Sequence, residues 1–294
     1  PRRSGIGGAG VLRDRARAER TAVPVMPNGY EGKVKLTVVG GLPTAVVTRQ
    51  GLANLMVKDC LRARECGSNW QPKLVFSSNG QGVALAGSDT RFFAAMIAAD
   101  LIHADGMSVV HASRLTSNPL PERVATTDFF HDAAEAAGEA GLRFFLLGST
   151  PEQNAAAEKE IRRLYPRVNI VGSYNGYFDE SEDEEVCREI VSRGTDILWV
   201  ALGKPRQEYW CVRNRARLMG VGWIKTCGGL YAFLSGDAPR PPRWMQAFGL
   251  EWLFRAFNDP KRLLWRYVTT NPYALYRLVR YTKDVPPKSH ARGQ

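Results

Sequence analysis

The sequence of 294 residues has few cysteines and no visible metal-binding pattern. Its five cysteines are scattered and form no C-x-x-C pair, as is typical of a reduced, cytoplasmic protein without structural zinc. The four histidines have no ligand spacing among themselves. No run of 18 apolar residues occurs, so we expect no transmembrane helix. No apolar segment follows the N-terminal arginines, so we expect no signal peptide.

A clean metal-binding pair of acids is also missing. The acidic run at residues 179–185 is consecutive, without an isolated D-x-D motif. Consecutive acids are typical of a helix N-terminus, where they complement the helix dipole. The sequence therefore predicts no metal and no cofactor.

What the chain does have is an uneven charge. The net charge is +11, with 44% hydrophobic and 23% charged residues, which indicates a folded protein. Residues 1–35 carry +5 and residues 240–283 carry +7, whereas residues 36–239 carry −2. Both ends are therefore basic. They favour either nucleic acid or an anionic membrane surface as a partner.

From residue 34 the sequence shows an alternation of strands and helices. Seven apolar runs have strand length, namely Lys35–Val39, Leu74–Ser77, Asp100–His103, Leu142–Leu147, Val168–Gly172, Ile197–Leu202 and Gly222–Thr226. Helical spacing is found at Gln50–Arg64, Asp128–Ala140, Pro151–Leu164, Glu182–Arg193 and Arg206–Met219. This alternation predicts an α/β fold, a Rossmann-like, mainly parallel sheet with flanking helices.

We divide the chain into four regions. Residues 1–33 form a flexible basic arm, 34–238 the Rossmann-like domain, 239–283 a basic aromatic helical appendage and 284–294 a flexible tail. The arm contains Gly5-Ile6-Gly7-Gly8-Ala9-Gly10, a G-x-G-x-x-G pattern. No strand can precede it, which argues against dinucleotide binding and against a dehydrogenase.

Polar residues follow several predicted strands at the point where each ends. They are Ser78-Asn79-Gly80, Ala104-Asp105-Gly106, Gly148-Ser149-Thr150-Pro151 and Gly203-Lys204-Pro205-Arg206-Gln207-Glu208. The carboxyl ends of parallel strands meet at one edge, where such sheets bind ligands. Each loop alone would fit a simple turn, but four on one edge indicate a site.

Three features of the sequence have two interpretations each: the loop at residues 148–150, Asp105 and Arg123. Gly148, Ser149 and Thr150 precede a helix with Pro151 at its first position, so they form either a phosphate-binding terminus or an ordinary capped helix. Asp105 is either a general base or the cap of the next helix. Arg123 either binds a diphosphate or pairs with Glu122 or Asp128.

The C-terminal segment interleaves Trp and Tyr with Arg. Pro260 follows Asp259 as in a helix start, and Arg262, Trp265 and Arg266 lie close together on that helix. Such a surface is typical of a membrane interface, with rings at headgroup depth and cations at lipid phosphate. The alternative is a packed helical hairpin with snorkelling arginines.

Together these motifs resemble the WecG/TagA/CpsF family, glycosyltransferase family 26, over roughly residues 34–283. The matching stretches are Ser77-Ser78-Asn79, Ala104-Asp105-Gly106, Glu122-Arg123-Val124, Phe145-Leu146-Leu147-Gly148, Asn175-Gly176-Tyr177-Phe178, Gly203–Glu208, Arg240-Pro241-Pro242-Arg243-Trp244 and Gly249-Leu250-Glu251-Trp252-Leu253. As a set, in this order and spacing, they are highly specific.

The resemblance implies an inverting, metal-independent transfer of a hexose from a UDP-sugar. The expected donor sugar is of the glucose or N-acetylmannosamine type. The implied acceptor is a sugar on undecaprenyl diphosphate, in the biosynthesis of a surface polysaccharide or exopolysaccharide. The enzyme would be cytoplasmic and peripheral on the inner face of the plasma membrane, where the appendage would contact anionic lipid. A homo-oligomer is compatible with this assignment, and no nucleic acid is expected.

By the same resemblance, Asp105 would be the catalytic base in the domain of residues 34–238. Ser77, Asn79, Arg123 and Gln207 would bind substrate. Apart from the resemblance, the leaving UDP needs positive partners, and we expect the backbone N–H groups of Gly148, Ser149 and Thr150 to supply them together with an arginine. The basic residues that would bind the lipid, its diphosphate or the membrane surface are Arg240, Arg243, Arg255, Arg262 and Arg266. Ala232 stands where the family has an Asp, and Ser77 where Thr is frequent. The alternative function is a basic nucleic-acid-binding module on a Rossmann-like body.

Overall fold

The structure is a computed structural model that describes residues 34–242, 244–245, 250–258 and 260–285. Side chains at 255, 258, 260–264 and 266 are not among those described. The predicted arm of residues 1–33 lies outside the described residues, as does most of the predicted tail.

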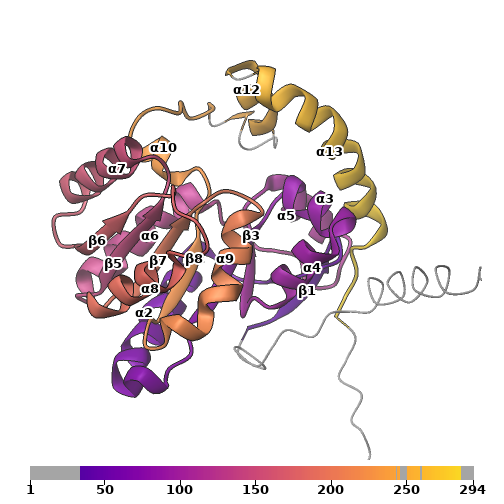
Figure 1. Cartoon of the computed structure of the whole chain (residues 1–294). Coiled ribbons are helices and arrows are strands. Elements are labelled where there is room, and N and C mark those ends of the chain that lie inside the picture. Colours follow the sequence, from indigo (N-terminus) through magenta and orange to yellow (C-terminus); the bar gives the residue numbers. More distant parts are fainter. Residues whose placement is uncertain (1–33, 243, 246–249, 259, 286–294) are drawn as a thin grey trace, which may run out of the picture.

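A six-stranded sheet in the order β4-β3-β8-β7-β5-β6 forms the centre of the molecule (Figure 1). Its strands are β3 (Lys73–Ser78), β4 (Leu101–Ala104), β5 (Arg143–Gly148), β6 (Asn169–Tyr174), β7 (Ile197–Ala201) and β8 (Trp223–Thr226). All neighbouring pairs are parallel. The predicted Rossmann-like sheet is therefore confirmed, and all six strands lie within two residues of the expected bounds.

The first predicted strand lies elsewhere. Residues Leu36–Val39 form β1, which pairs with β2 (Leu42–Ala45) in a separate antiparallel sheet. The turn consists of Gly40 and Gly41, which both have positive φ, as tight two-residue hairpins require. The placement of Lys35–Val39 in the parallel sheet was wrong, because this two-residue turn folds the strand back onto β2 before it can cross to another strand.

Helices cover both faces of the sheet, because alternate strand side chains are buried on opposite sides. On one face lie α2 (Arg49–Cys66), α6 (Thr126–Glu139), α7 (Pro151–Leu164) and the short α10 (Leu230–Leu234). The other face is covered by α3 (Gly80–Ser88), α4 (Thr90–Ile97), α8 (Asp183–Ser192) and α9 (Arg206–Asn214). Helix α5 (Met107–Ser113) follows β4. The five predicted helices are present, although α9 ends at Asn214 and continues as a 3-10 turn (Arg215–Leu218).

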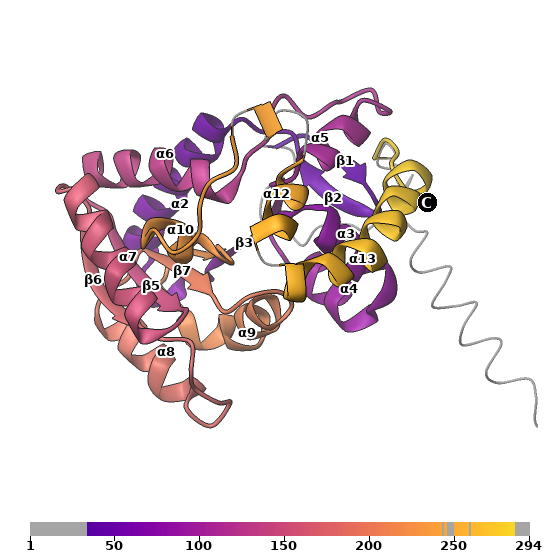
Figure 2. The ribbon, with the colours of Figure 1, turned by 90° about the horizontal axis from the view of Figure 1, so that it is seen from above.

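The C-terminal segment forms two helices, α12 (Glu251–Asn258) and α13 (Pro260–Arg280). Figures 1 and 2 show α13 on the side of the molecule that carries α3, α4 and α5, and it packs against α3 and α5. Arg277 on α13 is buried and donates hydrogen bonds of 3.3 and 3.1 Å to the carbonyl oxygen of Gly40. Val38 forms a β-bridge with Lys283 just beyond α13. The end of the segment is thus joined to the β1–β2 hairpin.

None of the helices in the described part of the chain combines the length and apolar character that crossing a bilayer needs.

Candidate active site

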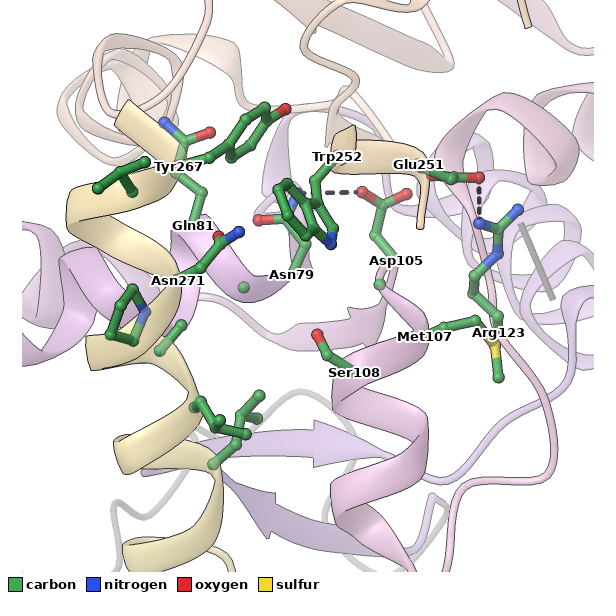
Figure 3. Close-up of a pocket in the computed structure, with 17 residues that line it drawn as sticks. Asn79, Gln81, Asp105, Met107, Ser108, Arg123, Glu251, Trp252, Tyr267 and Asn271 are labelled. Atoms are coloured by element: carbon green, nitrogen blue, oxygen red, sulfur yellow. Dashed lines mark hydrogen bonds and ion pairs between the residues drawn. The ribbon is translucent and has the colours of Figure 1, made fainter. Parts of the chain in front are cut away.

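A cavity of about 680 Å³ opens at the carboxyl edge of the sheet, between α13 and the start of α5 (Figure 3). Asn79 after β3, Asp105 after β4 and Arg123 line it from the sheet domain. Glu251 and Trp252 line it from α12, and seven residues from Tyr267 to Leu278 line it from α13. The structure therefore brings together three of the predicted site residues, which the topology places on neighbouring loops.

Both oxygens of the Asp105 carboxylate are held by hydrogen bonds. Asn79 Nδ2 donates to Asp105 Oδ2 at 3.3 Å, and the backbone N–H of Thr126 donates to Oδ1 at 2.7 Å. The start of α5 is not capped by Asp105, since Gly106 occupies the N-cap. Asn79 is itself fixed, because its Oδ1 caps α3 by accepting from the N–H of Gly82 at 3.0 Å. The carboxylate is thus oriented in the cavity wall.

Among the described residues that line this cavity, Arg123 carries the positive charge. Its guanidinium pairs with Glu251 of α12 (Figure 3). It also pairs with Asp128 of α6, at 3.3 Å. Burial alone would lower the pKa of Arg123, but Glu251, Asp105 and Asp128 outweigh burial and raise it above its usual value. Of the two ion-pair partners considered from the sequence, Asp128 is the one observed. Glu122 instead accepts from the N–H of Arg49 at 2.7 Å.

Ser77 and Gln207 do not line the cavity but lie behind it in a buried network. The Ser77 carbonyl accepts from Lys204 Nζ at 2.7 Å, and Lys204 also contacts Glu208 at 3.1 Å. Gln207 donates to Glu208 at 2.9 Å and accepts from the N–H of Gly228 at 3.1 Å. These contacts join the end of β3 to the segments that follow β7 and β8.

The loop Gly148–Thr150 lies on the same edge of the sheet but away from the cavity. Strands β8 and β7 separate β3 from β5, a distance of about 14 Å at normal strand spacing. Thr150 caps α7 by accepting from the N–H of Gln153 at 3.2 Å, and Pro151 occupies the first turn. Ser149 has a φ of +63°. The predicted cap by Thr150 is thus present, and a phosphate role for this loop stays a prediction.

The predicted C-terminal arginines are only partly described. Arg240 forms an ion pair with Asp128 at 3.2 Å, so it is linked through Asp128 to Arg123. Arg243 lies outside the described residues. Arg255, Arg262 and Arg266 belong to α12 and α13, but their side chains are not among those described.

The acidic run forms the N-terminus of α8, as predicted. Asp183 of this turn is buried and accepts from Trp210 Nε1 at 2.8 Å and from Asn214 Nδ2 at 2.9 Å. Within the described ranges, no group of three His, Cys, Asp or Glu side chains is arranged to hold a metal ion. All five cysteines are free thiols.

Several residues of the cavity were not predicted from the sequence. Glu251 and Trp252 belong to a stretch that we had noted, but without a role in the site. Tyr267 and Asn271 lie four residues apart on α13, and Tyr267 contacts Trp252 with ring centroids 5.8 Å apart. The four-residue spacing of Tyr267 and Asn271 indicates that both lie on one face of a helix. The sequence does not show that this face lines the cavity that contains Asp105.

An α/β fold with an oriented carboxylate and a partly buried arginine at the carboxyl edge suits a transferase that acts on a charged substrate. A family model, described as the Glycosyl transferase WecG/TagA/CpsF family, matches residues 38–286. The chain therefore belongs to this family of glycosyltransferases. The match includes the whole cavity, both its sheet-domain and its α12–α13 residues.

Proposed function

We propose that this protein is an inverting, metal-independent hexosyltransferase. It moves a glucose- or N-acetylmannosamine-type sugar from a UDP-sugar to a sugar on undecaprenyl diphosphate, in surface or exopolysaccharide biosynthesis. The observation that carries the proposal is the Asp105 carboxylate, which Asn79 and the Thr126 N–H hold beside Arg123 in the cavity. A fixed carboxylate next to a cation suits proton removal beside an anionic substrate.

In the proposed reaction, Asp105 removes the proton of the acceptor hydroxyl as its oxygen attacks the anomeric carbon. The bond between that carbon and the UDP oxygen breaks, and UDP leaves with the electron pair. A single displacement of this kind inverts the anomeric configuration. Without a metal, the charge on the leaving diphosphate would be balanced by Arg123 in the cavity wall.

The α13 side of the cavity supports a lipid-linked acceptor. Its lining there is mostly apolar, with Val268, Pro272, Ala274, Leu275 and Leu278. Large apolar side chains on α13 are also exposed, namely Trp265, Val268, Leu275, Tyr276 and Val279. An exposed apolar stripe in a basic segment is typical of a helix that lies on an anionic membrane. We therefore place the enzyme at the inner face of the plasma membrane, peripherally bound through α12 and α13.

The proposed reaction is tested by UDP release in EDTA, with a panel of UDP-sugars and a short-chain polyprenyl-diphosphate monosaccharide. We expect release with one donor, and only in the presence of the acceptor. Asp105→Asn should lower turnover by at least a thousandfold while UDP binding persists, whereas Asp132→Asn on α6 serves as control. Turnover retained in Asp105→Asn would remove the assigned base.

The membrane contact has its own test. Val279→Glu places a charge on the exposed stripe of α13 and should lower co-sedimentation with vesicles that contain anionic lipid. Leu164→Glu, at the exposed end of α7, is the matched control and should bind as the unmodified protein does. Equal binding of both variants would contradict a membrane role for α13.

A further inference from the structure

The cavity has a wall of uncharged side chains to which the proposed reaction assigns no role. Gln81 in the first turn of α3, Trp252 on α12 and Asn271 on α13 belong to it, and we call these three residues the uncharged wall. In the view of Figure 3, Trp252 stands between Asp105 on one side and the two amide side chains on the other. A molecule held against Asp105 would therefore meet the uncharged wall.

Packed helices hold this part of the cavity in place. Helix α13 packs against α3 and α5. A Cβ at Gly80, where α3 begins, would lie 3.9 Å from both the Ala274 Cβ on α13 and the Ser108 Oγ on α5. The three helices thus meet closely beside the cavity. Polar groups on packed helices have well-defined positions, as the recognition of a small ligand requires.

The amide groups of Gln81 and Asn271 are available to a ligand. Both side chains are partly buried, and neither forms a hydrogen bond with another residue in the described part of the chain. A side-chain amide offers both a donor and an acceptor, and a sugar hydroxyl also donates and accepts. Two such amides in one cavity therefore match a ring that carries several hydroxyl groups.

Trp252 adds an aromatic surface to these polar groups. It is 38% exposed, although it lines the cavity. Tyr267 supports its indole, with ring centroids 5.8 Å apart and an angle of 64° between the ring planes. The C–H groups on one face of a pyranose ring form an apolar surface that can pack on an indole. An aromatic ring with a few polar groups beside it is the usual lining of a small-ligand site.

The charges of the cavity disfavour an acidic ligand at the uncharged wall. Among the described lining residues, Asp105 and Glu251 are acidic and Arg123 is basic. Arg123 already pairs with Glu251 and with Asp128. A carboxylate on a sugar beside Asp105 would be repelled by that residue and would find no cation on the uncharged wall.

We propose that the uncharged wall is the subsite for the acceptor sugar, and that it selects an uncharged hexose. The inference rests on the proposed function, because a base at Asp105 must lie within hydrogen-bond reach of the acceptor hydroxyl. One face of the sugar packs on Trp252, and its hydroxyl groups bind Gln81 and Asn271. The lipid chain then follows the apolar lining of α13.

The first test measures binding of the acceptor without any transfer. The probes are short-chain polyprenyl diphosphates that carry glucose, galactose, N-acetylglucosamine or glucuronic acid, and the same lipid diphosphate without a sugar. The sugar gain is the Kd of the sugar-free lipid divided by the Kd of the sugar-bearing lipid. We expect a gain of about tenfold for at least one uncharged sugar, and about tenfold weaker binding of the glucuronic acid probe than of that sugar. No gain from any uncharged sugar, or an equal gain from glucuronic acid, would overturn the proposal.

The second test removes the two amides. Asn271→Leu and Gln81→Leu should each reduce the sugar gain about fivefold and leave the Kd of the sugar-free lipid nearly unchanged. Their Tm should stay equal, since neither amide loses a partner in the protein. Asn54→Leu, an exposed asparagine on α2, is the matched control. An unchanged sugar gain in both amide variants, or equal weakening of the sugar-free lipid, would overturn the proposal.

Trp252 is tested by two variants of different shape. Trp252→Leu removes the aromatic surface and should reduce the sugar gain about tenfold, whereas Trp252→Phe keeps a ring and should reduce it about twofold. Trp244→Leu, an exposed tryptophan that does not line the cavity, is the matched control. Equal sugar gains in Trp252→Leu and in the unmodified protein would refute the packing of the sugar on this indole.

The donor distinguishes this subsite from the rest of the cavity. The Kd for UDP-glucose should be the same in Asn271→Leu and Gln81→Leu as in the unmodified protein, and weaker donor binding in both would overturn the proposal by placing the donor at this wall. Sugar-dependent binding of the lipid without any hexosyl transfer would refute the proposed function and leave the subsite intact. Hexosyl transfer with an unchanged sugar gain in every variant would refute the subsite alone.

Discussion

Arg123 and Glu251 form an ion pair in the cavity wall, although 128 residues separate them in the chain. Arg123 comes from the sheet domain, whereas Glu251 begins α12. With Asp128 on its other side, the guanidinium faces two carboxylates. A substrate diphosphate that binds Arg123 must therefore compete with Glu251.

Removal of the Glu251 charge should strengthen anion binding at Arg123. Glu251→Gln leaves Asp128 as partner, and the Kd for UDP or inorganic diphosphate should fall about fivefold, or ~1 kcal/mol, as for a partly exposed ion pair. Titration calorimetry at low salt measures this Kd. Glu139→Gln, at the exposed end of α6, removes the same charge and is the control, so its Kd should be unchanged. Arg123→Gln should bind UDP and diphosphate weakly. Weaker binding in Glu251→Gln would show that Glu251 assists the anion instead.

Asn79 both caps α3 and donates a hydrogen bond to Asp105, and two variants can separate these roles. Asn79→Asp keeps the oxygen that caps α3 but loses the N–H donor and places a second carboxylate beside Asp105. Its Tm should stay close to that of the unmodified protein, while kcat/KM falls roughly a hundredfold. Asn79→Ala loses the cap as well and should cost about 1 kcal/mol of stability. Full activity in Asn79→Asp would show that the hydrogen bond to Asp105 is dispensable.

The contact between α3 and α13 depends on Gly87. A Cβ at this position would lie 2.4 Å from Arg277 Cδ and 2.6 Å from the Tyr273 hydroxyl. Gly87→Ala should therefore displace Arg277, lower stability by ~1–3 kcal/mol and speed proteolysis within α13. Gly80→Ala on the same helix is the control, since its Cβ meets only ordinary contacts at 3.9 Å. Equal proteolysis of both variants would mean that α13 is not held through Arg277.

Asp196 makes stability depend on pH at the amino-terminal end of β7. Burial would raise its pKa, but hydrogen bonds from Arg64 and Arg143 outweigh burial and hold the pKa below 3.8. A lowered folded-state pKa contributes stability above the unfolded value, and this is lost as pH falls through the folded value. Asp196→Asn should thus cost ~3 kcal/mol at pH 7 and about 1 kcal/mol less at pH 3, which lies roughly one unit below the unfolded pKa, as measured by urea unfolding. A cost independent of pH would contradict this linkage.

Much of the fold was predictable because the parallel strands are buried on both faces. Their apolar runs are therefore continuous, as in Leu142–Leu147, and the loops after them share one edge. That the loops with Asn79 and Asp105 share one edge was predicted, whereas their direct contact depends on the pairing of β3 with β4 that the structure shows. Helix α3 was missed because Gly80, Gly82 and Gly87 weaken the helical pattern that local sequence can show.

The strand–helix alternation, the carboxyl-edge loops and the family could be read from the amino-acid sequence, because these depend on local hydrophobic patterns and on motifs of fixed spacing. Two contacts could be known only from the three-dimensional structure: the ion pair of Glu251 with Arg123, and the hydrogen bonds by which Arg277 joins α13 to Gly40. Such contacts join segments far apart in the chain. They depend on how helices pack and which way side chains point, and no local pattern encodes either.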